Sequence, residues 1–358
     1  MGLAVFIYVI LFWSLVLAWL NIPLQVPPSA TGVPISIIIA AHNEEGNLPI
    51  LLPCLLAQLY PAFEVILVLD RCTDHSLRIC QDFQAKDERI RIIRIEEPPS
   101  NWSPKKWAIH TAIHEAKYEW LAFTDADCTM GNRWLSTLAG HLKHHQVVLG
   151  VGVYEEKSGL LNQFIQYETL YTAFQYIGAA KGGIPYMAVG RNLAYQKQFF
   201  TKHDGFLGVE EKLSGDDDLL INAYANTSQT ACMIQPESLT YSVPKTTFFS
   251  WFWQKTRHVS ASHSYSFMSK GLLALFHLSM VWFYMGILLT LVFNLTVSLV
   301  FTLYICRLIA CGTGWYLIRQ KLPRSTVLAL FPLWEIFMCL YHLLIVPVGL
   351  ILTPKWKK

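Results

Sequence analysis

The chain has 358 residues, of which 53% are hydrophobic and only 15% are charged. Ordinary soluble domains are about 25% charged, so this composition excludes a disordered chain and argues against a purely soluble enzyme. The formal net charge is +3, but residues 44–270 hold 21 basic and 24 acidic side chains. This mildly acidic part lacks the basic face of a nucleic-acid-binding protein. The eight cysteines form no C-x-x-C pair, so no zinc site or disulfide framework is predicted.

The N-terminal segment is long enough to cross a bilayer. Residues 3–20 contain a single polar side chain, Ser14, and eighteen apolar residues just span the hydrocarbon core. A cleaved signal peptide is the alternative, but a charged region before the apolar run and a small-x-small cleavage site are both missing. We therefore predict a retained transmembrane anchor over residues 1–22.

Strand and helix signals alternate between residues 34 and 124. Apolar or β-branched runs predict strands over 35–41, 65–69, 90–95 and 120–124, and helical spacing predicts helices over 47–59, 74–86 and 103–117. Continuous apolar strands separated by helices are typical of a parallel sheet with right-handed crossovers. Ligands of such sheets bind beyond the carboxyl ends of the strands.

Acidic residues follow all four predicted strands. They are Glu44 and Glu45, Asp70 and Asp74, Glu96 and Glu97, and Asp125 with Asp127. Turns and helix caps favour Asp and Asn, which explains Asp74 and the Glu pair. It explains Asp125-x-Asp127 poorly, because two carboxylates two residues apart repel each other. Such an oxygen-rich cluster suits a hard cation, Mg²⁺ or Mn²⁺, shared with a phosphate.

The C-terminal part is predicted to be a transmembrane region over residues 271–352. Residues 271–306 are uncharged and predict two short helices joined by a turn. A third candidate, 327–350, contains Glu335 and His342, which should face protein or water. Pro332 and Pro347 leave a re-entrant hairpin open as the alternative.

Basic residues predict the side of the membrane on which the loops lie. Residues 307–358 carry seven basic and one acidic side chain. The loop expected to be cytoplasmic contains Arg307, Arg319, Lys321 and Arg324. A spanning third helix would put the C-terminal lysines outside, whereas a hairpin would keep them inside, and the sequence leaves this choice open.

Five segments resemble glycosyltransferase family 2, whose fold is GT-A. Residues 34–45 (PISIIIAAHNEE) resemble its opening strand and A-x-N-E-E turn, and 65–74 (VILVLDRCTD) resemble V-V-D-D-x-S-T-D. Residues 124–127 (TDAD) are similar to its D-x-D and 215–218 (GDDD) to its G-E-D. Residues 254–258 (QKTRH) resemble the Q-x-x-R-W of membrane-embedded members such as ceramide glucosyltransferase and the cellulose and hyaluronan synthases. The likeness covers roughly residues 34–260. Leu69, Asp216 and His258 depart from these patterns.

The resemblance implies an α/β fold: a GT-A domain with a Rossmann-like, mixed, mainly parallel sheet over 34–265, one N-terminal and two to three C-terminal transmembrane helices. It implies an inverting transfer of a sugar from a nucleotide-diphosphate donor, UDP-linked by preference, with Asp217 as the base beside Asp216. Asp127 would bind Mg²⁺ or Mn²⁺, and Asp125 would share the metal or contact ribose. The remaining residues implied in binding are Gln254 and Arg257 for the diphosphate, Lys105, Glu44 and Asp70 for the nucleotide, Arg191 and Asn192 for the donor sugar, and His258, which replaces the acceptor-side Trp.

A lipid or lipid-linked acceptor is predicted because the chain re-enters the membrane about a dozen residues after Arg257. The predicted location is the cell inner membrane with a cytoplasmic catalytic domain. A processive polysaccharide synthase is the alternative, although such enzymes need more spans. A non-catalytic nucleotide-sugar-binding membrane component and a transporter or channel are the alternatives from other classes. His110 and His114 have metal-ligand spacing but lack the Glu of a zinc protease. The sequence does not identify the particular acceptor, the sugar or the oligomeric state.

Overall fold

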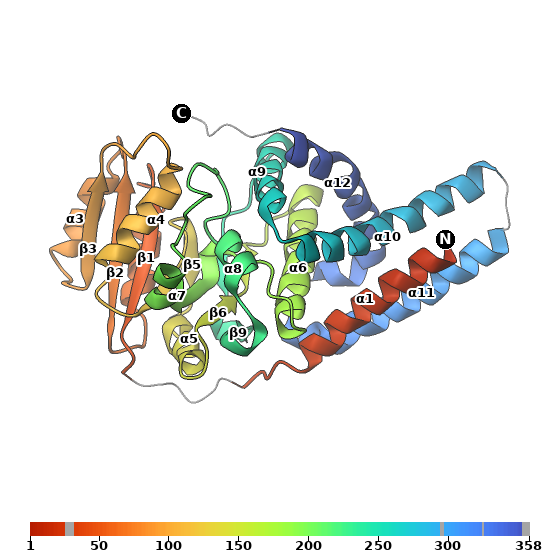
Figure 1. The fold of residues 1–358 in the computed structure, drawn as a ribbon, viewed down its shortest axis with the longest axis horizontal. Helices are drawn as coiled ribbons and strands as arrows, with labels where there is room; N and C mark the ends of the chain where they lie inside the picture. Colours follow the sequence, from red (N-terminus) through yellow and green to blue (C-terminus); the bar gives the residue numbers. More distant parts are fainter. Residues whose placement is uncertain (26–31, 294–296, 324–325, 353–358) are drawn as a thin grey trace. The chain divides into compact units, whose positions relative to one another are not determined.

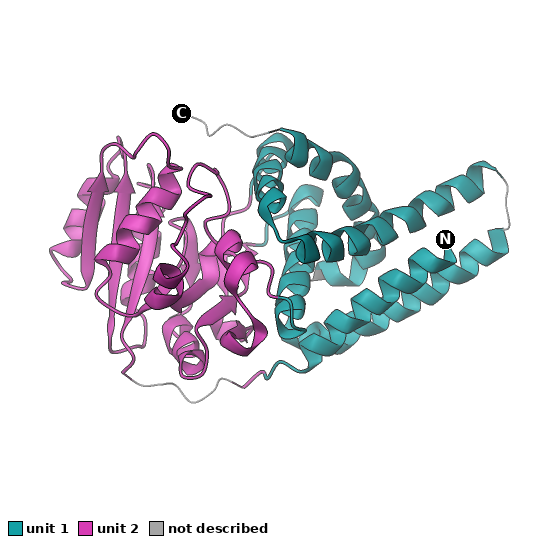
Figure 2. Ribbon diagram, viewed as in Figure 1, with its two compact units in different colours: residues 1–23, 156–184, 245–354 teal, residues 24–155, 185–244, 355–358 magenta. Residues whose placement is uncertain are grey.

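The computed structural model describes residues 1–25, 32–293, 297–323 and 326–352. They form two compact units (Figure 2). Unit 1 contains Met1–Pro23, Glu156–Ile184 and the C-terminal part from Lys245, and unit 2 contains Leu24–Glu155 and Pro185–Pro244. The predicted domain 34–265 therefore differs from unit 2, because residues 156–184 and 245–265 pack with the long apolar helices of unit 1 instead.

Unit 2 is built on a seven-stranded sheet in the order β3-β2-β1-β4-β8-β6-β9 (Figure 1). Strands β1, β2, β3 and β4 are parallel to one another, and β8 is antiparallel to both β4 and β6. The prediction of a mixed, mainly parallel sheet is confirmed. The strands are β1 (Ile35–Ala41), β2 (Phe63–Asp70), β3 (Ile90–Ile95), β4 (Trp120–Phe123), β6 (Val147–Gly150), β8 (Leu193–Gln196) and β9 (Thr230–Met233). A smaller sheet contains β5 (Cys128–Met130), β10 (Thr240–Ser242) and β7 (Gly152–Tyr154).

Helices cover both faces of the larger sheet because its strands are apolar on both sides. The side chains of Ile37, Ile39, Val65 and Leu67 form a buried core with α2 (Leu48–Leu56) and α5 (Trp134–Leu142). Helix α4 (Pro104–Glu115) packs against β1 and β2. The other helices of unit 2 are α3 (Ser76–Gln84), α7 (Lys197–Lys202) and α8 (Asp218–Tyr224), with short 3₁₀ turns η1 (Gly190–Asn192), η2 (Thr227–Gln229) and η3 (Pro236–Ser238).

Helices α2, α3 and α4 begin and end within a few residues of their predicted bounds. Ser103 precedes Pro104 at the start of α4, as predicted. Helix α3 begins at Ser76 rather than at Asp74, because the Asp74 carboxylate accepts the Ser76 N–H at 3.0 Å and closes a turn before the helix. Helix α2 ends at Leu56, three residues before its predicted end.

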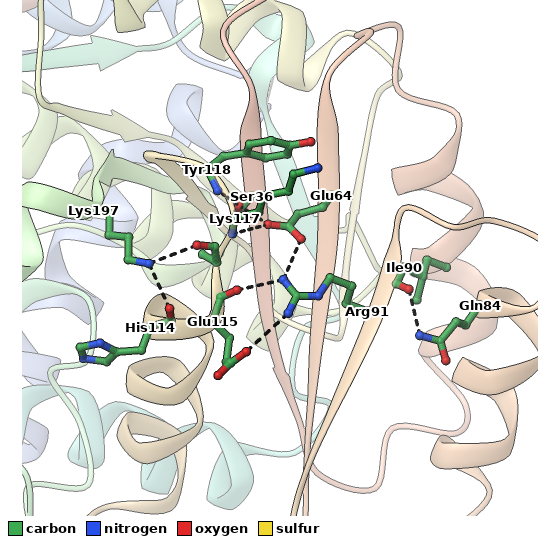
Figure 3. Close-up of polar contacts among 11 residues, drawn as sticks. Ser36, Glu64, Gln84, Ile90, Arg91, His114, Glu115, Lys117, Tyr118 and Lys197 are labelled. Carbon is green, nitrogen blue, oxygen red and sulfur yellow. Dashed lines mark hydrogen bonds and ion pairs between the residues drawn. The ribbon is translucent and has the colours of Figure 1, made fainter.

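A buried carboxylate organises the amino ends of the parallel strands (Figure 3). Glu64, at the start of β2, accepts the Ser36 hydroxyl at 2.6 Å, the Lys117 N–H at 2.7 Å and Arg91 Nη1 at 3.1 Å. Arg91 also donates to the Glu115 carbonyl at 2.9 Å, near the end of α4. One side chain thus joins the starts of β1, β2 and β3 to the turn before β4.

Replacing Glu64 with alanine is expected to lower the free energy of unfolding by about 2 kcal/mol, because three donors lose a charged acceptor in a site where Glu64 is only 5% exposed. The matched control is Glu115→Ala, because the exposed Glu115 carboxylate contacts the same Arg91 at 3.5 Å. That change is expected to cost less than about 0.5 kcal/mol. Urea unfolding of the detergent-solubilised chain, followed by tryptophan fluorescence, measures both. Equal losses of unfolding free energy in the two variants would contradict the role of Glu64 in joining the strands.

Unit 1 contains the helices that are long and apolar enough to cross a membrane. In the described part of the chain there are four: α1 (Gly2–Leu20), α10 (Phe267–Val292), the segment formed by α11 (Val297–Ile318) with the turn η5 (Arg319–Lys321), and the segment formed by the turn η6 (Thr326–Leu330) with α12 (Phe331–Ile351). The prediction of one N-terminal and up to three C-terminal candidates is confirmed. Unit 1 also holds α6 (Leu160–Lys181), α9 (Phe248–Ala261) and η4 (Ser262–Ser264).

One prediction about this region is wrong. Arg307 does not lie in a loop: it is in the middle of α11 and only 1% exposed. Its Nη1 and Nη2 donate to the Glu335 carboxylate of α12 at 2.6 and 3.1 Å. The buried partner lets α11 continue eleven residues beyond the charge, because a paired guanidinium is tolerated inside an apolar helix bundle.

Candidate active site

The three consecutive acids lie at the start of α8. Asp217 is the N-cap, and its Oδ1 accepts the Asp218 N–H at 2.9 Å. Its Oδ2 accepts the Gly190 N–H at 2.6 Å from the turn that precedes β8. Each oxygen of the Asp217 carboxylate is therefore fixed by a backbone donor, and each keeps a further lone pair for a second partner.

Lys105 joins two of the predicted acids. Its Nζ lies 3.0 Å from Asp125 Oδ1 at the end of β4 and 2.9 Å from Asp216 Oδ2. The next residue, Lys106, is 1% exposed, and its ammonium donates to the Val209 carbonyl at 2.7 Å. The first turn of α4 therefore contacts the segment 209–216 at both of its ends, Val209 through Lys106 and Asp216 through Lys105.

A pocket opens among these groups. Its polar wall contains Lys105, Asp125, Asp216 and Asp217, and its apolar wall comes from β1, β4, β8 and α4. The apolar residues are Ile38, Ala40, Ile109, Phe123, Leu193 and Tyr195. Asp125, which follows β4, thus meets Asp216 and Asp217 of a segment distant in the sequence.

Burial and charge separate the two neighbouring acids. Burial and the adjacent Asp216 and Asp218 raise the pKa of Asp217 well above its usual value. Burial alone would also raise the pKa of Asp216, but the Lys105 ammonium overcomes it and leaves that pKa lowered. Burial lowers the pKa of Lys105, yet Asp125, Asp216 and Asp217 together raise it well above its usual value. Asp216 and Lys105 are therefore an ion pair, and Asp217 is the acid whose protonated form the site favours.

Asp125, Asp127 and Cys128 offer ligand atoms that all lie within 4.8 Å of one another. Cys128 is buried, its Sγ lies 3.3 Å from Ser242 Oγ, and burial with the two nearby acids raises its pKa to about 12. The thiol stays protonated, so the carboxylates supply the donors. The carboxylates of the half-buried Asp125 and the exposed Asp127 fit a hard cation such as Mg²⁺ or Mn²⁺.

The residues predicted to contact the nucleotide lie at the ends of β1 and β2. Glu44 Oε2 accepts Asn47 Nδ2 at 2.6 Å, and its pKa is raised by burial and by the nearby Asp127 and Asp125. Asp70 is 5% exposed and forms a two-point pair with Arg71, with both distances 2.9 Å. Sequence reasoning missed the role of Arg71. Its guanidinium neutralises the Asp70 carboxylate, which was expected to be available to the nucleotide.

Arg191 and Asn192 follow the turn that contacts Asp217. The Asn192 amide donates to the carbonyls of Val151 and Ser238 at 2.9 and 2.7 Å, and its oxygen accepts Trp134 Nε1 at 3.0 Å. Arg191 donates to the Gly152 carbonyl at 2.8 Å. These contacts join β8 to neighbouring strands, so both side chains organise the fold around the site, and their contact with a donor sugar stays a prediction.

Two glycines make this packing possible. A Cβ on Gly150 would lie 2.3 Å from Asn192 Cγ, and one on Gly152 would lie 2.2 Å from Arg191 Nε. Sequence reasoning missed both residues. The signal was the spacing Gly150-x-Gly152, because residues two apart in an extended chain lie on the same side of it.

Gln254, Arg257 and His258 belong to α9 and therefore to unit 1, whereas the pocket belongs to unit 2. Their predicted roles toward the diphosphate and the acceptor stay predictions. His110 and His114 have ring centroids 4.4 Å apart and lie among Trp102, Trp107 and Phe200, so they are part of an aromatic cluster.

Comparison with known proteins defines the class of this fold. Residues 36–203 match the family model described as Glycosyl transferase family 2. Over 97% of this chain and 94% of the other, the fold is similar to that of the mannosyltransferase PcManGT from Pyrobaculum calidifontis in complex with GDP-Man and Mn²⁺, with a TM-score of 0.58 and 17% identity. At that identity the likeness shows the GT-A fold alone. Residues 36–203, a little under half of the chain, therefore resemble a family 2 glycosyltransferase domain.

Curated relatives match this chain over part of their lengths. The chain is 27% identical to the probable glycosyltransferase YdaM of Bacillus subtilis over 238 residues, which is 62% of this chain and 54% of that protein. It is 28% identical to the glycosyltransferase AglE of Haloferax volcanii over 112 residues, 30% of this chain and 36% of the other. The chain therefore spans about half the length, or less, of these relatives.

Proposed function

We propose that the protein transfers a sugar, with inversion, from a nucleotide-diphosphate sugar to a lipid or lipid-linked acceptor at the cytoplasmic face of a membrane. The observation that carries this proposal is the Asp217 carboxylate. It is held by two backbone donors at the wall of a pocket, beside the fixed pair of Lys105 and Asp216.

The chemistry follows from the states of these groups. Asp217 accepts the proton of the acceptor hydroxyl as that oxygen forms a bond to C1 of the sugar. The bond from C1 to the diphosphate breaks, and the diphosphate leaves with the electron pair. Attack from the side opposite the leaving group inverts the configuration at C1. Lys105 supplies a positive charge next to Asp125 in the wall of the pocket, where it would offset negative charge on a bound nucleotide diphosphate.

Asp127 and Asp125 would hold the divalent cation, which when bound offsets negative charge on the diphosphate. In Asp125, Oδ1 is already engaged by Lys105, so Oδ2 is the atom left toward a metal or ribose. The acceptor is proposed to be a lipid because the unit that contains the four long apolar helices is joined to the catalytic unit by several chain crossings.

The decisive assay is nucleotide release by the detergent-purified chain. A panel of UDP-, GDP- and TDP-sugars is offered with Mg²⁺ or Mn²⁺, with and without a membrane lipid extract. Release with one donor that requires the extract supports the proposal and names the sugar. Tight nucleotide binding without release under every condition would favour a non-catalytic sugar-nucleotide-binding component. Many sugars added to one product molecule would favour a processive synthase.

Metal dependence gives a separate prediction. Asp127→Asn, or removal of divalent cations with EDTA, is expected to lower release by more than about 10²-fold, because a metal at the diphosphate contributes several kcal/mol to the transition state. Asp82→Asn, on the exposed surface of α3, is the isosteric control and should leave release unchanged. Undiminished release by Asp127→Asn, with the same response to Mn²⁺ concentration, would remove Asp127 from the metal site.

A further inference from the structure

Three helices of unit 1 form a bundle whose ends are defined by their contacts. Arg307 of α11 lies over the ring of Tyr8 of α1 at 4.2 Å, and Trp315 contacts Phe12 with centroids 5.4 Å apart, so the two helices run in the same direction. Helix α10 runs in the opposite direction, because Phe276 contacts Tyr8 at 4.9 Å while Gly286 lies against Met1.

One end of this bundle is where α1 and α11 finish and α10 begins. Lys321, just after α11, fixes it: its ammonium donates to the carbonyls of Trp19 and Leu20 at 2.9 and 2.7 Å, and of Ile22 at 2.5 Å. The chain passes into unit 2 after Pro23. We call this the connection end.

Helix α12 does not follow the path of a spanning helix. A span that starts after Lys321 at the connection end would finish at the opposite end, beside the last turn of α10. Instead, Glu335, in the first turns of α12, accepts Tyr284 of α10 at 3.2 Å and Arg307 at 2.6 Å, half-way along the bundle.

The rest of α12 returns toward the connection end. The ring of His342 contacts that of His277 with centroids 3.8 Å apart, and His277 is about two turns closer to the start of α10 than Tyr284. The Leu350 carbonyl is 2.5 Å from His263 Nε2, in the turn that precedes α10. A Cβ on Gly349 would lie 2.8 Å from Val259 Cβ in α9. The last turn of α12 therefore packs where α10 begins.

We propose that α12 is a re-entrant helix that lies in one leaflet, so that the chain crosses the bilayer three times, through α1, α10 and α11. Its partner is the acyl chains of the leaflet on the connection side. Leu333, Ile336, Leu340, Leu343 and Leu344 are each 44–61% exposed, and their spacing puts them on one face of the helix. Helices α10 and α11 also expose large apolar side chains, such as Leu278 and Ile309, which the same acyl chains would cover.

Charge supports the same arrangement. Arg319 and Lys321 lie at the connection end, and Lys355, Lys357 and Lys358 follow α12 in the sequence. A re-entrant α12 keeps both groups on one side, the cytoplasmic side by the positive-inside rule, whereas a spanning α12 would divide them. Non-spanning backbone at membrane depth is tolerated because α12 is packed against protein along α9 and α10.

Reporters on the full-length chain test this topology. Green fluorescent protein, which fluoresces in the cytoplasm, and alkaline phosphatase, which is active only outside, are fused in turn to the C-terminus and, separately, to the N-terminus. An epitope inserted at the exposed position His144 marks the side of unit 2. The proposal requires the C-terminus on the same side as the epitope and the N-terminus on the opposite side. A C-terminus on the side opposite the epitope overturns it.

Cross-linking tests the contact itself in native membranes. In a chain whose own cysteines are replaced by serine or alanine, the pair His263→Cys with Leu350→Cys should form a disulfide on mild oxidation. The pair Val292→Cys with Leu350→Cys should not, because Val292 ends α10 at the opposite end. The reverse pattern, with the second pair linked and the first unlinked, would show that α12 spans the bilayer.

Discussion

Asp217→Asn is expected to lower sugar transfer by about 10²- to 10⁴-fold, which is the contribution of a positioned general base. The amide cannot accept the proton of the acceptor hydroxyl, yet its oxygen can still accept one of the two backbone donors, Gly190 N–H or Asp218 N–H. We therefore expect the loss to appear in kcat, with little change in nucleotide affinity.

The control for this variant is Asp218→Asn. Asp218 is buried in the first turn of α8 and adjoins the site without lining the pocket. Its replacement should reduce kcat far less than Asp217→Asn. Thermal melting of both variants checks that the N-terminus of α8 is retained. If Asp217→Asn kept the parent's kcat, another group would have to take the proton.

The raised pKa of Asp217 gives the reaction a recognisable pH dependence. Burial and the adjacent Asp216 and Asp218 favour its protonated form. A base acts only when deprotonated, so kcat should fall as the pH drops through the raised pKa and should level off above it. The acid limb should lie at higher pH than for an ordinary aspartate, and the residual activity of Asp217→Asn should lack it. A limb at the usual pKa of Asp would contradict the assignment.

The sheet and its acidic edge could be predicted from sequence because their determinants are local. The apolar runs that became β1 and β3 have their predicted bounds, and parallel topology places Asp125 at the carboxyl end of β4. Lys105 was placed near the nucleotide by resemblance alone. Its contacts with both Asp125 and Asp216 depend on two loops that are distant in sequence.

The parts that sequence reasoning missed depend on pairs of residues far apart. Arg307 reads as a loop residue until Glu335, 28 positions later, is found to neutralise it. Asn192 reads as a ligand-binding amide until Gly150 is found to leave room for its internal bonds. Hydropathy contains no information about which polar groups are satisfied inside the fold.

The pair of Arg307 and Glu335 carries the largest expected effect on stability. Both side chains are 1% exposed, and Tyr8 and Tyr284 donate their hydroxyls to the same carboxylate at 3.0 and 3.2 Å. The cluster therefore joins α1, α10, α11 and α12. Glu335→Leu leaves the guanidinium buried without its counter-ion and should lower the free energy of unfolding by about 3–5 kcal/mol.

The double variant Arg307→Met with Glu335→Leu separates charge from packing. The double variant leaves no buried charge without a counter-ion. Replacement of a buried ion pair by apolar residues of similar volume often leaves the free energy of unfolding unchanged. We expect the double variant to regain most of the stability that either single variant loses, which makes the coupling energy of the cycle strongly favourable. Unfolding in detergent, followed by near-ultraviolet circular dichroism, measures all four proteins. Additive losses would mean that each side chain acts through its own packing, and the ion pair would then contribute nothing to the cohesion of the helices.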